Sequence, residues 1–253
     1  MLNLRIDLKT YPDRGGRRHI ALRGLQLDVA PGEFVCLVGP SGCGKSTLLN
    51  LVGGLDTDFA GQVQINGAAP GAGIGFMFQS PRLMPWLSVL DNVRLVLDQS
   101  PASDARAREL LTAMELGDVL KAYPCHLSGG MQRRVALARA FAVEPKLLLM
   151  DEPFVSLDAP TADRLRAMLI GLQQRCGSTV VFVTHDLREA LALSDRVCFL
   201  SGAPGRVVYE MPIATPKPRS PRVLSDLHED LLRQHPDLLA GLTANATHAE
   251  MAA

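Results

Sequence analysis

The stretch GPSGCGKST, residues 39–47, constrains the fold more than any other part of this sequence. It fits the pattern G-x-x-x-x-G-K-[ST], follows the apolar run EFVCLV and opens the helical pattern KSTLLNLVGGL. Phosphate groups need backbone N–H groups at close range, which side chains would block, and a helix N-terminus behind the loop adds a favourable dipole. The stretch therefore predicts a strand–loop–helix unit that holds nucleotide phosphates, in preference to a chance glycine-rich turn.

The whole loop is expected to contact the nucleotide, and its residues have different roles. Lys45 is predicted to reach the β- and γ-phosphates, and the Ser46 hydroxyl to ligate Mg²⁺. Cys43 is interpreted as a small residue of the loop and not as a nucleophile. The predicted nucleotide-binding residues of the loop are Gly39, Pro40, Ser41, Gly42, Cys43, Gly44, Lys45, Ser46 and Thr47.

An acidic motif, LLLMDEP at residues 147–153, ends another apolar run. Ligands of α/β sheets bind at the C-terminal ends of the strands. Asp151 is therefore predicted to hold Mg²⁺, directly or through water, and Glu152 to orient and deprotonate the water that attacks the γ-phosphate. The alternative, an acidic strand end that faces solvent, loses weight beside the phosphate loop.

Two more polar residues follow apolar runs in the same way. His185 follows STVVFVT and is predicted to contact the γ-phosphate, although a histidine in this place is more often a surface or capping residue. Gln79 follows IGFMF and is predicted to contact the metal or the attacking water, although alone it is an ordinary polar strand end. Both predictions are supported only because the phosphate loop already indicates a bound nucleotide.

Three residues have two interpretations each. Asp158 either caps the helix that follows it or takes part in the site. Tyr11 is either an ordinary aromatic residue at a strand end or a flat face on which adenine stacks. Trp86, the only tryptophan, is expected to pack in the core, and the alternative is an apolar element that docks on a partner.

The order of the patterns predicts an α/β fold. From Lys146 on, strand-like and helical patterns alternate, as in a parallel α/β core. About residues 81–142 are predicted to be helical, with Ser103 as the N-cap of one helix. Residues 212–221 read as a Pro-rich linker, and Ser225 is expected to cap a last amphipathic helix before a disordered tail.

Composition excludes several classes of protein. With 253 residues, 47% of them hydrophobic and 21% charged, the chain has ample length for a core. Its 26 basic and 26 acidic residues balance, which argues against nucleic acid as a partner. The five cysteines show no CxxC spacing and are expected to be reduced thiols. The sequence contains no apolar run long enough for a signal peptide or a membrane span.

The stretch LSGGMQRRVALARAFA, residues 127–142, raises a separate question because it opens a helix with two glycines. Either a flexible loop meets a solvated amphipathic helix, or a ligand approaches the backbone of Gly129 and Gly130 closely. Bare amides at a positive helix end suit a phosphate. The arginines are interpreted as a solvated face, with Arg133 and Arg134 as salt-bridge partners.

Taken together, the phosphate loop, Gln79, LSGGMQ, LLLMDE, SLD and THD, in this order and spacing, resemble the ATP-binding subunits of ABC transporters. The resemblance covers about residues 2–210. The stretches FMFQSPRLMPWLSVLDNV and LSGAPGRVV are similar to those of importers for nitrate, sulfonates, taurine and related small solutes. VSLD replaces the more usual GALD, and His126 stands where glutamine is common, so the catalytic set is untouched.

The resemblance implies a P-loop NTPase with a RecA-like core, an antiparallel β-subdomain and an inserted α-helical subdomain at about residues 81–142. It implies a nucleotide-binding domain over residues 1–215, with a linker, a short helix and a disordered tail over residues 216–253. It implies ATP and Mg²⁺ as ligands. The implied catalytic residues are Glu152, His185 and Lys45, the metal-binding residues are Ser46, Gln79 and Asp151, and Tyr11 binds adenine.

The resemblance also implies a homodimer in which each ATP lies between the phosphate loop of one copy and the signature of the other. A membrane permease would contact the segment after Gln79, a solute-binding protein would act indirectly, and the chain would lie peripherally on the cytoplasmic face of the inner membrane. The residues implied to act across the dimer are Ser128, Gly129, Gly130, Gln132 and Asp158.

The implied activity is ATP hydrolysis that powers import of a small nitrate-, sulfonate- or taurine-like solute. One alternative is the ATPase subunit of a system that moves lipids or lipoproteins. Another is an ABC ATPase outside transport, but those need a long coiled-coil insertion or two tandem cassettes, and the chain has neither. A P-loop kinase or GTPase has no reason for LSGGMQ. The solute itself is not encoded in these motifs.

Overall fold

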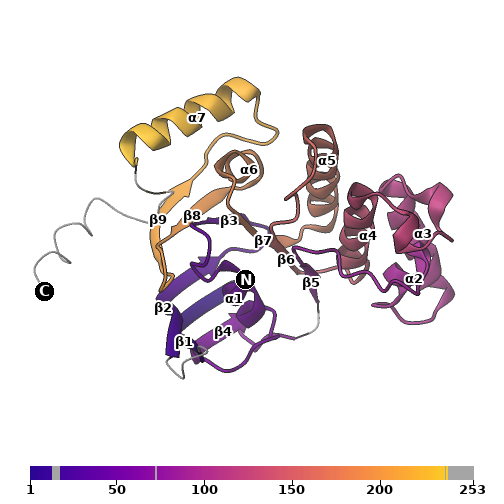
Figure 1. Ribbon diagram of the computed structural model, residues 1–253, viewed down its shortest axis with the longest axis horizontal. Helices are drawn as coiled ribbons and strands as arrows, with labels where there is room; N and C mark the ends of the chain where they lie inside the picture. The colour runs from indigo at the N-terminus through magenta and orange to yellow at the C-terminus, as the bar shows by residue number, and fades with distance from the viewer. Residues whose placement is uncertain (13–17, 72, 237, 239–253) are drawn as a thin grey trace, which may run out of the picture. The chain divides into compact units, whose positions relative to one another are not determined.

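The computed structural model describes residues 1–12, 18–71, 73–236 and 238, which fall into two compact units (Figure 1). The first unit comprises Met1–Gly71 together with Val181–Ala253, and the second comprises Ala72–Val180. The chain returns to the first unit within strand β7 (Thr179–Thr184).

An antiparallel sheet forms one part of the first unit. Its strands are β1 (Leu2–Pro12), β2 (Arg18–Val29) and β4 (Ala60–Ile65), in the order β2-β1-β4. Along β1 the side chains of Leu2, Leu4 and Ile6 alternate with exposed neighbours and are buried, as expected for a sheet with one covered face. The predicted antiparallel β-subdomain is therefore present.

The other strands of the first unit are short and apolar. Strand β3 (Phe34–Val38) is buried throughout and pairs in parallel with β8 (Arg196–Leu200). The order continues from β7 through β3 and β8 to β9 (Val207–Pro212), which is antiparallel to β8. Strand β9 was not predicted, because its first residues were read only as a family motif and its last as the start of a linker.

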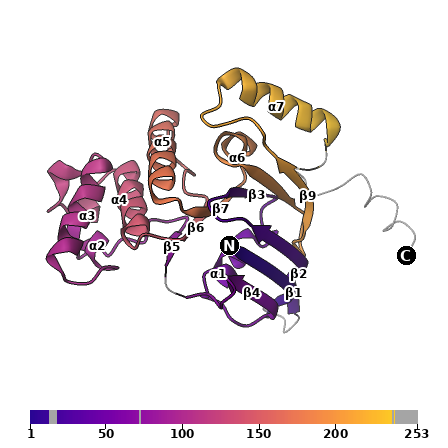
Figure 2. The same cartoon turned by 180° about the vertical axis from the view of Figure 1, so that it is seen from behind.

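The described residues of the first unit also form the helices α1 (Lys45–Val52), α6 (Leu187–Leu193) and α7 (Pro221–Gln234). Helix α7 contacts α6 and runs across it, as both views show (Figures 1 and 2). Its N-cap is Ser220, whose side chain accepts a hydrogen bond from the Val223 amide. The prediction that Ser225 caps this helix was wrong, because Pro221 at the first helical position starts it a turn earlier. The predicted tail at residues 239–253 lies outside the described residues.

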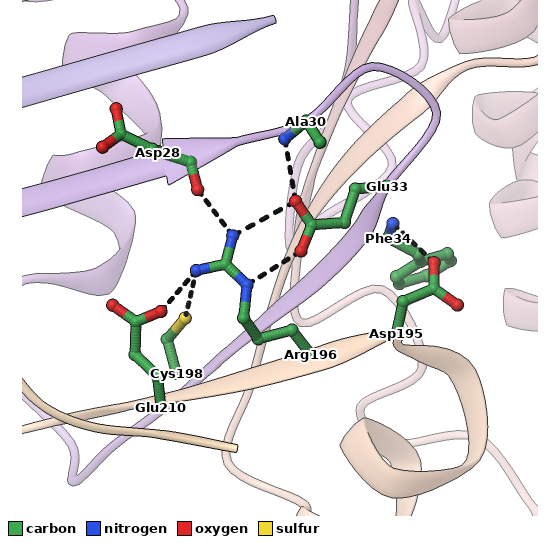
Figure 3. A network of polar contacts seen from close by, with 8 residues as sticks. All are labelled: Asp28, Ala30, Glu33, Phe34, Asp195, Arg196, Cys198 and Glu210. Atoms are coloured by element: carbon green, nitrogen blue, oxygen red, sulfur yellow. Dashed lines mark hydrogen bonds and ion pairs between the residues drawn. The ribbon is translucent and has the colours of Figure 1, made fainter. Parts of the chain in front are cut away.

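A half-buried arginine joins three strands of the first unit (Figure 3). The Arg196 guanidinium forms a two-pronged contact with Glu33, at 2.8 and 3.1 Å, and also contacts Glu210 of β9 and the Asp28 carbonyl of β2. The hydrogen bond with Glu33 is the main reason why the pKa of Arg196 is raised. Burial raises the pKa of the neighbouring Cys198 thiol to about 12, against the opposing effect of Arg196. All five cysteines are free.

The second unit contains one parallel strand pair and most of the helices. Strand β5 (Ile74–Met77) pairs with β6 (Leu147–Asp151). Helices α2 (Val89–Arg94), α3 (Pro101–Ala113) and α4 (Gly129–Ala142) pack on one another, and α5 (Ala159–Cys176) contacts α4 (Figure 2). Two 3₁₀ turns, Gly117–Val119 and Pro124–His126, lie between α3 and α4.

The helical segment predicted for residues 81–142 is present but starts later than expected. Residues 81–88 are irregular, and the first helix begins at Val89. Helix α3 is capped by Ser100, not by Ser103 as predicted, because Pro101 again occupies the first helical position. Within the described residues, no helix has both the length and the apolar character that crossing a membrane requires.

Candidate active site

The loop GPSGCGKST connects β3 to α1, as predicted. Gly42 and Gly44 have positive φ angles of 79° and 97°, and α1 begins at Lys45 directly after Gly44. Ser41, Gly42 and Ser46 are exposed, whereas the strand before the loop is fully buried. The loop thus presents its glycine backbone and a hydroxyl group outward at a helix N-terminus, the arrangement that binds phosphate.

The glycines of the loop serve two different purposes. A Cβ on Gly42 would meet no atom within 4 Å, so this position is open to a ligand. A Cβ on Gly44 would lie 2.6 Å from Leu22 Cδ2, and one on Gly39 would lie 3.0 Å from Cys43 Sγ. All three glycines were expected from the sequence to give phosphate access to the backbone. Gly39 and Gly44 are in addition required by packing within the chain.

A residue far along the chain backs the same loop. A Cβ on Gly205, in the turn between β8 and β9, would lie 2.0 Å from the Cys43 carbonyl oxygen. The Gly205 amide donates to the Ala21 carbonyl of β2 at 2.9 Å, and its carbonyl accepts from the Arg23 amide. The phosphate loop is therefore held between this turn and β2.

Lys45 is folded over its own loop. Its side chain is 6% exposed, and its Nζ donates to the carbonyls of Gly39, at 2.7 Å, and Pro40, at 2.9 Å. Cys43 Sγ lies 3.9 Å from Lys45 Nζ. Burial raises the pKa of the Cys43 thiol, although Lys45 acts in the opposite direction. A buried, protonated thiol agrees with the interpretation of Cys43 as a small packing residue.

Two other predicted site residues lie in the first unit. Tyr11 is half-buried near the end of β1 and has side-chain hydrogen bonds with Asp56 and with Thr47 of the phosphate-loop helix. Burial raises the pKa of the Tyr11 phenol, and the bond from Thr47 opposes the shift. His185 follows β7 and is exposed. The structure thus brings Tyr11 next to the loop helix.

The second unit brings Gln79, Asp151 and Glu152 to one edge. Met77 of β5 is paired with Met150 of β6 in a parallel register, so the chain leaves both strands at the same end. Asp151 ends β6 and is half-buried, as is Glu152, whose φ angle is +44°. A positive φ is costly for a residue with a side chain and is typical of functional sites.

Arg133 of α4 holds the backbone around these residues. It is 8% exposed, and its guanidinium donates to the carbonyls of Pro153, at 2.5 Å, Val155, at 2.6 Å, and Gln79, at 3.3 Å. The prediction of a solvated, salt-bridged side chain was wrong for Arg133. For Arg134 the ion pair was predicted correctly, since it pairs with Glu115 at 3.1 Å, but its side chain is only 17% exposed and is not a solvated one.

The two glycines at the start of α4, Gly129 and Gly130, have different surroundings. Ser128 is exposed and caps the helix by accepting from the Met131 amide. A Cβ on Gly129 would meet no atom within 4 Å, whereas one on Gly130 would lie 2.6 Å from Thr161 Cγ2 of α5. Gly130 is therefore required by packing inside this chain, and only Gly129 presents an open backbone. The Gln132 amide is folded back onto the Pro124 carbonyl, at 3.0 Å.

The first interpretation holds for Asp158 and fails for Trp86. Asp158 is the N-cap of α5 and accepts from the Thr161 amide at 3.1 Å, so the capping interpretation is confirmed. Its hydrogen bonds with Thr161 hold the pKa of this exposed carboxyl below its usual value. Trp86 is 72% exposed, so the expectation that it packs in the core was wrong.

Several residues near the site were not predicted: Arg133, Gly205, and the ion pair of the buried Lys9 with the half-buried Asp56, which contacts Tyr11. A signal existed only for Arg133, which has Leu137 and Phe141 at i+4 and i+8 on the same buried face of α4. The other contacts join residues that are distant in the sequence.

An α/β fold with a glycine-rich loop between a buried strand and a helix, and an acidic strand end elsewhere, defines the class of P-loop nucleotide-binding proteins. Residues 22–155 match the family model described as ABC transporter. The chain belongs to the ABC transporter family, as an ATP-hydrolysing ATP-binding cassette.

Three similar proteins illustrate this membership. The chain is 47% identical over 225 residues to the aliphatic sulfonates import ATP-binding protein SsuB 2 of Burkholderia cenocepacia (strain HI2424), covering 88% of this chain and 82% of that protein. It is 45% identical over 246 residues to SsuB 1 of Xanthomonas axonopodis pv. citri (strain 306), covering 94% and 96%. A solved dimeric structure of the ATP-binding cassette MJ0796, in a post-hydrolysis state with ADP and Pi, matches with a TM-score of 0.76 and 35% identity, over 85% of this chain and all of that one.

Proposed function

We propose that this cassette powers the import of a small organic anion of the aliphatic sulfonate class through a separate membrane permease. Relatives that match 88% and 94% of the chain are named for sulfonate import, which supports this class of solute over lipids or lipoproteins. The chain would act at the cytoplasmic face of the inner membrane, bound peripherally to the permease.

In this proposal the phosphates of ATP lie on the exposed backbone of the loop 39–47. Lys45, now bonded to two carbonyls of its own loop, would turn its charge toward the β- and γ-phosphates. Tyr11 would stack on adenine. The Ser46 hydroxyl, the Asp151 carboxylate and the Gln79 amide oxygen are oxygen ligands of the kind Mg²⁺ prefers. When bound, the ion neutralises phosphate charge.

Hydrolysis needs a base and a contact with the γ-phosphate. Glu152 would accept the proton of the attacking water, and His185 would contact the γ-phosphate. Pro153, which follows Glu152, is buried and fixed by Arg133, so the backbone at the proposed base is rigid. This pre-organisation supports Glu152 as the base, because a base must stay within hydrogen-bond reach of its water.

The observation that carries the dimer is the open position of Gly129. A Cβ on Gly129 would meet no atom of the described residues within 4 Å, although Gly130 beside it is packed against Thr161. Ser128 and Gly129 would close the ATP site of a second copy with their helix N-terminus. Gln132 and Asp158, which are engaged within their own chain, would act across the dimer only by supporting this segment. The dimer of the similar cassette MJ0796 supports this arrangement.

The permease would dock on an apolar groove of the second unit. The groove has a volume of about 360 Å³ and is lined by Phe76, Phe78, Leu95, Val96 and the stem of Arg139, among others. Leu95 and Val96 of this groove are exposed, as is Trp86 of the same unit, although large apolar residues normally avoid water. A short helix of the permease with apolar side chains and an acidic residue would fit, since Arg82 and Arg139 line the same groove.

Hydrolysis is tested with Glu152→Gln. The variant should bind ATP with wild-type affinity and hydrolyse it at least about 10²-fold more slowly, because the base is removed and the shape is kept. Glu144→Gln is a matched control, since Glu144 lies on the surface of the same unit in contact with Arg106. Wild-type turnover in Glu152→Gln would exclude Glu152 as the base.

Solute class and partner are tested in cells. A strain that lacks this chain should fail to grow on an aliphatic sulfonate as sole sulfur source and grow normally on sulfate. The wild-type chain should restore growth, and Glu152→Gln should not. Trp86→Ala and Leu95→Asp should keep ATPase activity in the isolated chain yet release the membrane protein that copurifies with it in mild detergent. Normal growth of the deletion strain on sulfonate would reject this solute class.

A further inference from the structure

An ion pair of the buried Lys9 and the half-buried Asp56 lies next to Tyr11 in the first unit. Lys9 is 2% exposed, and its Nζ lies 2.9 Å from Asp56 Oδ1 and 2.5 Å from the Asp58 carbonyl oxygen. The same ammonium group lies 4.5 Å from the centre of the Tyr11 ring, within the range of a cation–π contact. A buried lysine is costly unless it is paired. Lys9 therefore holds the Asp56 carboxylate and the Asp58 carbonyl close to it.

The second oxygen of Asp56 fixes the Tyr11 hydroxyl. Tyr11 donates to Asp56 Oδ2 at 2.9 Å, and the side chain of Thr47, in the phosphate-loop helix, bonds to the same hydroxyl. The ring is thus held by its polar end, by one face and through the helix that carries Lys45 and Ser46. These contacts restrict both the position of the Tyr11 hydroxyl and the orientation of its ring.

Lys9 is in this place because the strand changes its register. The pairing of β1 with β4 shifts between Ile6 and Leu8, and the pairing with β2 shifts between Lys9 and Thr10. Before the shift the even-numbered residues are buried; after it, Leu8 is exposed and Lys9 points inward. Bulges of this kind re-aim side chains next to functional sites.

We propose that Lys9 and Asp56 are positioning residues that orient the Tyr11 ring for the base of the nucleotide, so that the chain distinguishes ATP from a bare triphosphate. The inference rests on the proposed role of Tyr11. A ring held at its hydroxyl presents its face to adenine without the loss of side-chain freedom that a loose ring would undergo on stacking. The phosphate loop would bind the triphosphate in either case.

The test compares dissociation constants for ATP and for inorganic tripolyphosphate, measured by calorimetry on the full chain. Asp56→Asn should weaken ATP binding about 2- to 10-fold, the range that one oriented aromatic contact contributes, and leave tripolyphosphate binding unchanged. The matched control is Asp58→Asn, which removes the same charge from a neighbouring side chain that is 99% exposed and 3.8 Å from Lys9. It should change neither constant.

A double-mutant cycle shows whether Asp56 acts through the hydroxyl of Tyr11. Tyr11→Phe keeps the ring and removes the hydroxyl, so Asp56→Asn should have no further effect on ATP affinity in that background. Tyr11→Phe is also the variant that tests the proposal if Asp56→Asn does not fold, because ATP affinity alone should fall.

Three results would overturn the proposal. Equal weakening of ATP and tripolyphosphate by Asp56→Asn would show a structural role. If ATP binding is unchanged in Asp56→Asn and in Tyr11→Phe but weaker in Tyr11→Ala, the positioning role of Asp56 is rejected. Tyr11 would then remain the adenine contact. Unchanged ATP binding in Tyr11→Ala would reject both roles, and the loss of all nucleotide binding in Lys45→Ala would still support the proposed ATP site.

Discussion

The guanidinium of Arg133 donates to the carbonyl oxygen of Pro153 at 2.5 Å and thereby fixes the residue that follows Glu152. The same side chain reaches the carbonyls of Gln79 and Val155. The helix that begins with the signature glycines is therefore bonded directly to the loops that carry the proposed base and the proposed metal-binding amide. Arg139, further along that helix, holds the carbonyls of Pro81 and Arg82 at 2.7 and 2.9 Å.

Replacement of this arginine should affect stability and hydrolysis together. Arg133→Met keeps an unbranched apolar stem but removes the guanidinium and leaves buried carbonyls without donors, so the free energy of unfolding should fall by about 2–4 kcal/mol. ATP hydrolysis should fall more than ATP affinity, because the phosphate loop belongs to another segment. Chemical denaturation and a steady-state assay measure the two effects. Arg134→Met, next to it, removes an ion pair with the exposed Glu115 and one hydrogen bond to the Met114 carbonyl, so it should cost less, about 1–2 kcal/mol; equal effects of the two changes would contradict the role given to Arg133.

The two signature glycines should respond differently to a methyl group. Gly130→Ala should lower the unfolding free energy by about 1–3 kcal/mol, because its Cβ would overlap Thr161. Gly129→Ala should not lower it, since the space is open and alanine favours helix. Thermal unfolding of the isolated chain distinguishes the two variants.

Gly129→Asp should block dimerisation without loss of monomer ATP binding. Its carboxylate would stand where the phosphates of the partner's ATP are expected, and like charges repel. In size-exclusion chromatography with ATP, the Glu152→Gln chain should elute as a dimer, and the same chain with Gly129→Asp should elute as a monomer. A stable dimer in the aspartate variant would exclude a site shared between two copies.

Cys43 should react slowly with alkylating reagents. Its side chain is fully buried, and burial raises its pKa, so less thiolate is present at neutral pH than in an ordinary cysteine. Because the thiolate is the reactive form, the rate should climb as the pH rises toward the raised pKa. Mass spectrometry at several pH values should show Cys125 and Cys176, which are exposed, labelled before Cys43. Cys43 labelled first at neutral pH would contradict this.

The boundary proposed at residue 215 should prove too early for stability. Arg219 is buried and its guanidinium donates to the carbonyls of Leu191, at 2.6 Å, and Ser194, at 2.9 Å. Leu231 of α7 is buried as well. A chain cut after Thr215 should therefore unfold at a lower denaturant concentration than one cut after Pro236, which keeps both residues. Equal midpoints would show that α7 adds nothing to the fold of the first unit.

The features that the sequence predicted correctly are local. The phosphate loop follows from a few residues in one order, and the buried runs before Gly39 and Asp151 identify strands without reference to the rest of the chain. Helix starts were less exact, because Ser100 and Ser103 are both good caps and only the position of Pro101 decides between them.

The features that the sequence did not predict depend on contacts between distant segments. Alternation along β1 places Lys9 on the solvent side, and only a bulge that involves β2 and β4 turns it inward. Trp86 was assigned to the core because large apolar residues usually lie there, but its side chain is 72% exposed. The difference between Gly129 and Gly130 depends on where Thr161 of α5 lies.

The near-contact between Gly205 and the Cys43 carbonyl has a consequence for how this cassette can change over evolution or in engineering. The phosphate loop cannot be transferred to another protein by itself, because it packs against a turn about 160 residues downstream. That turn leaves no room for a side chain at Gly205. A phosphate loop grafted from another protein would have to arrive together with its own version of that turn. Substitutions at the two places are thus expected to be inherited as a pair.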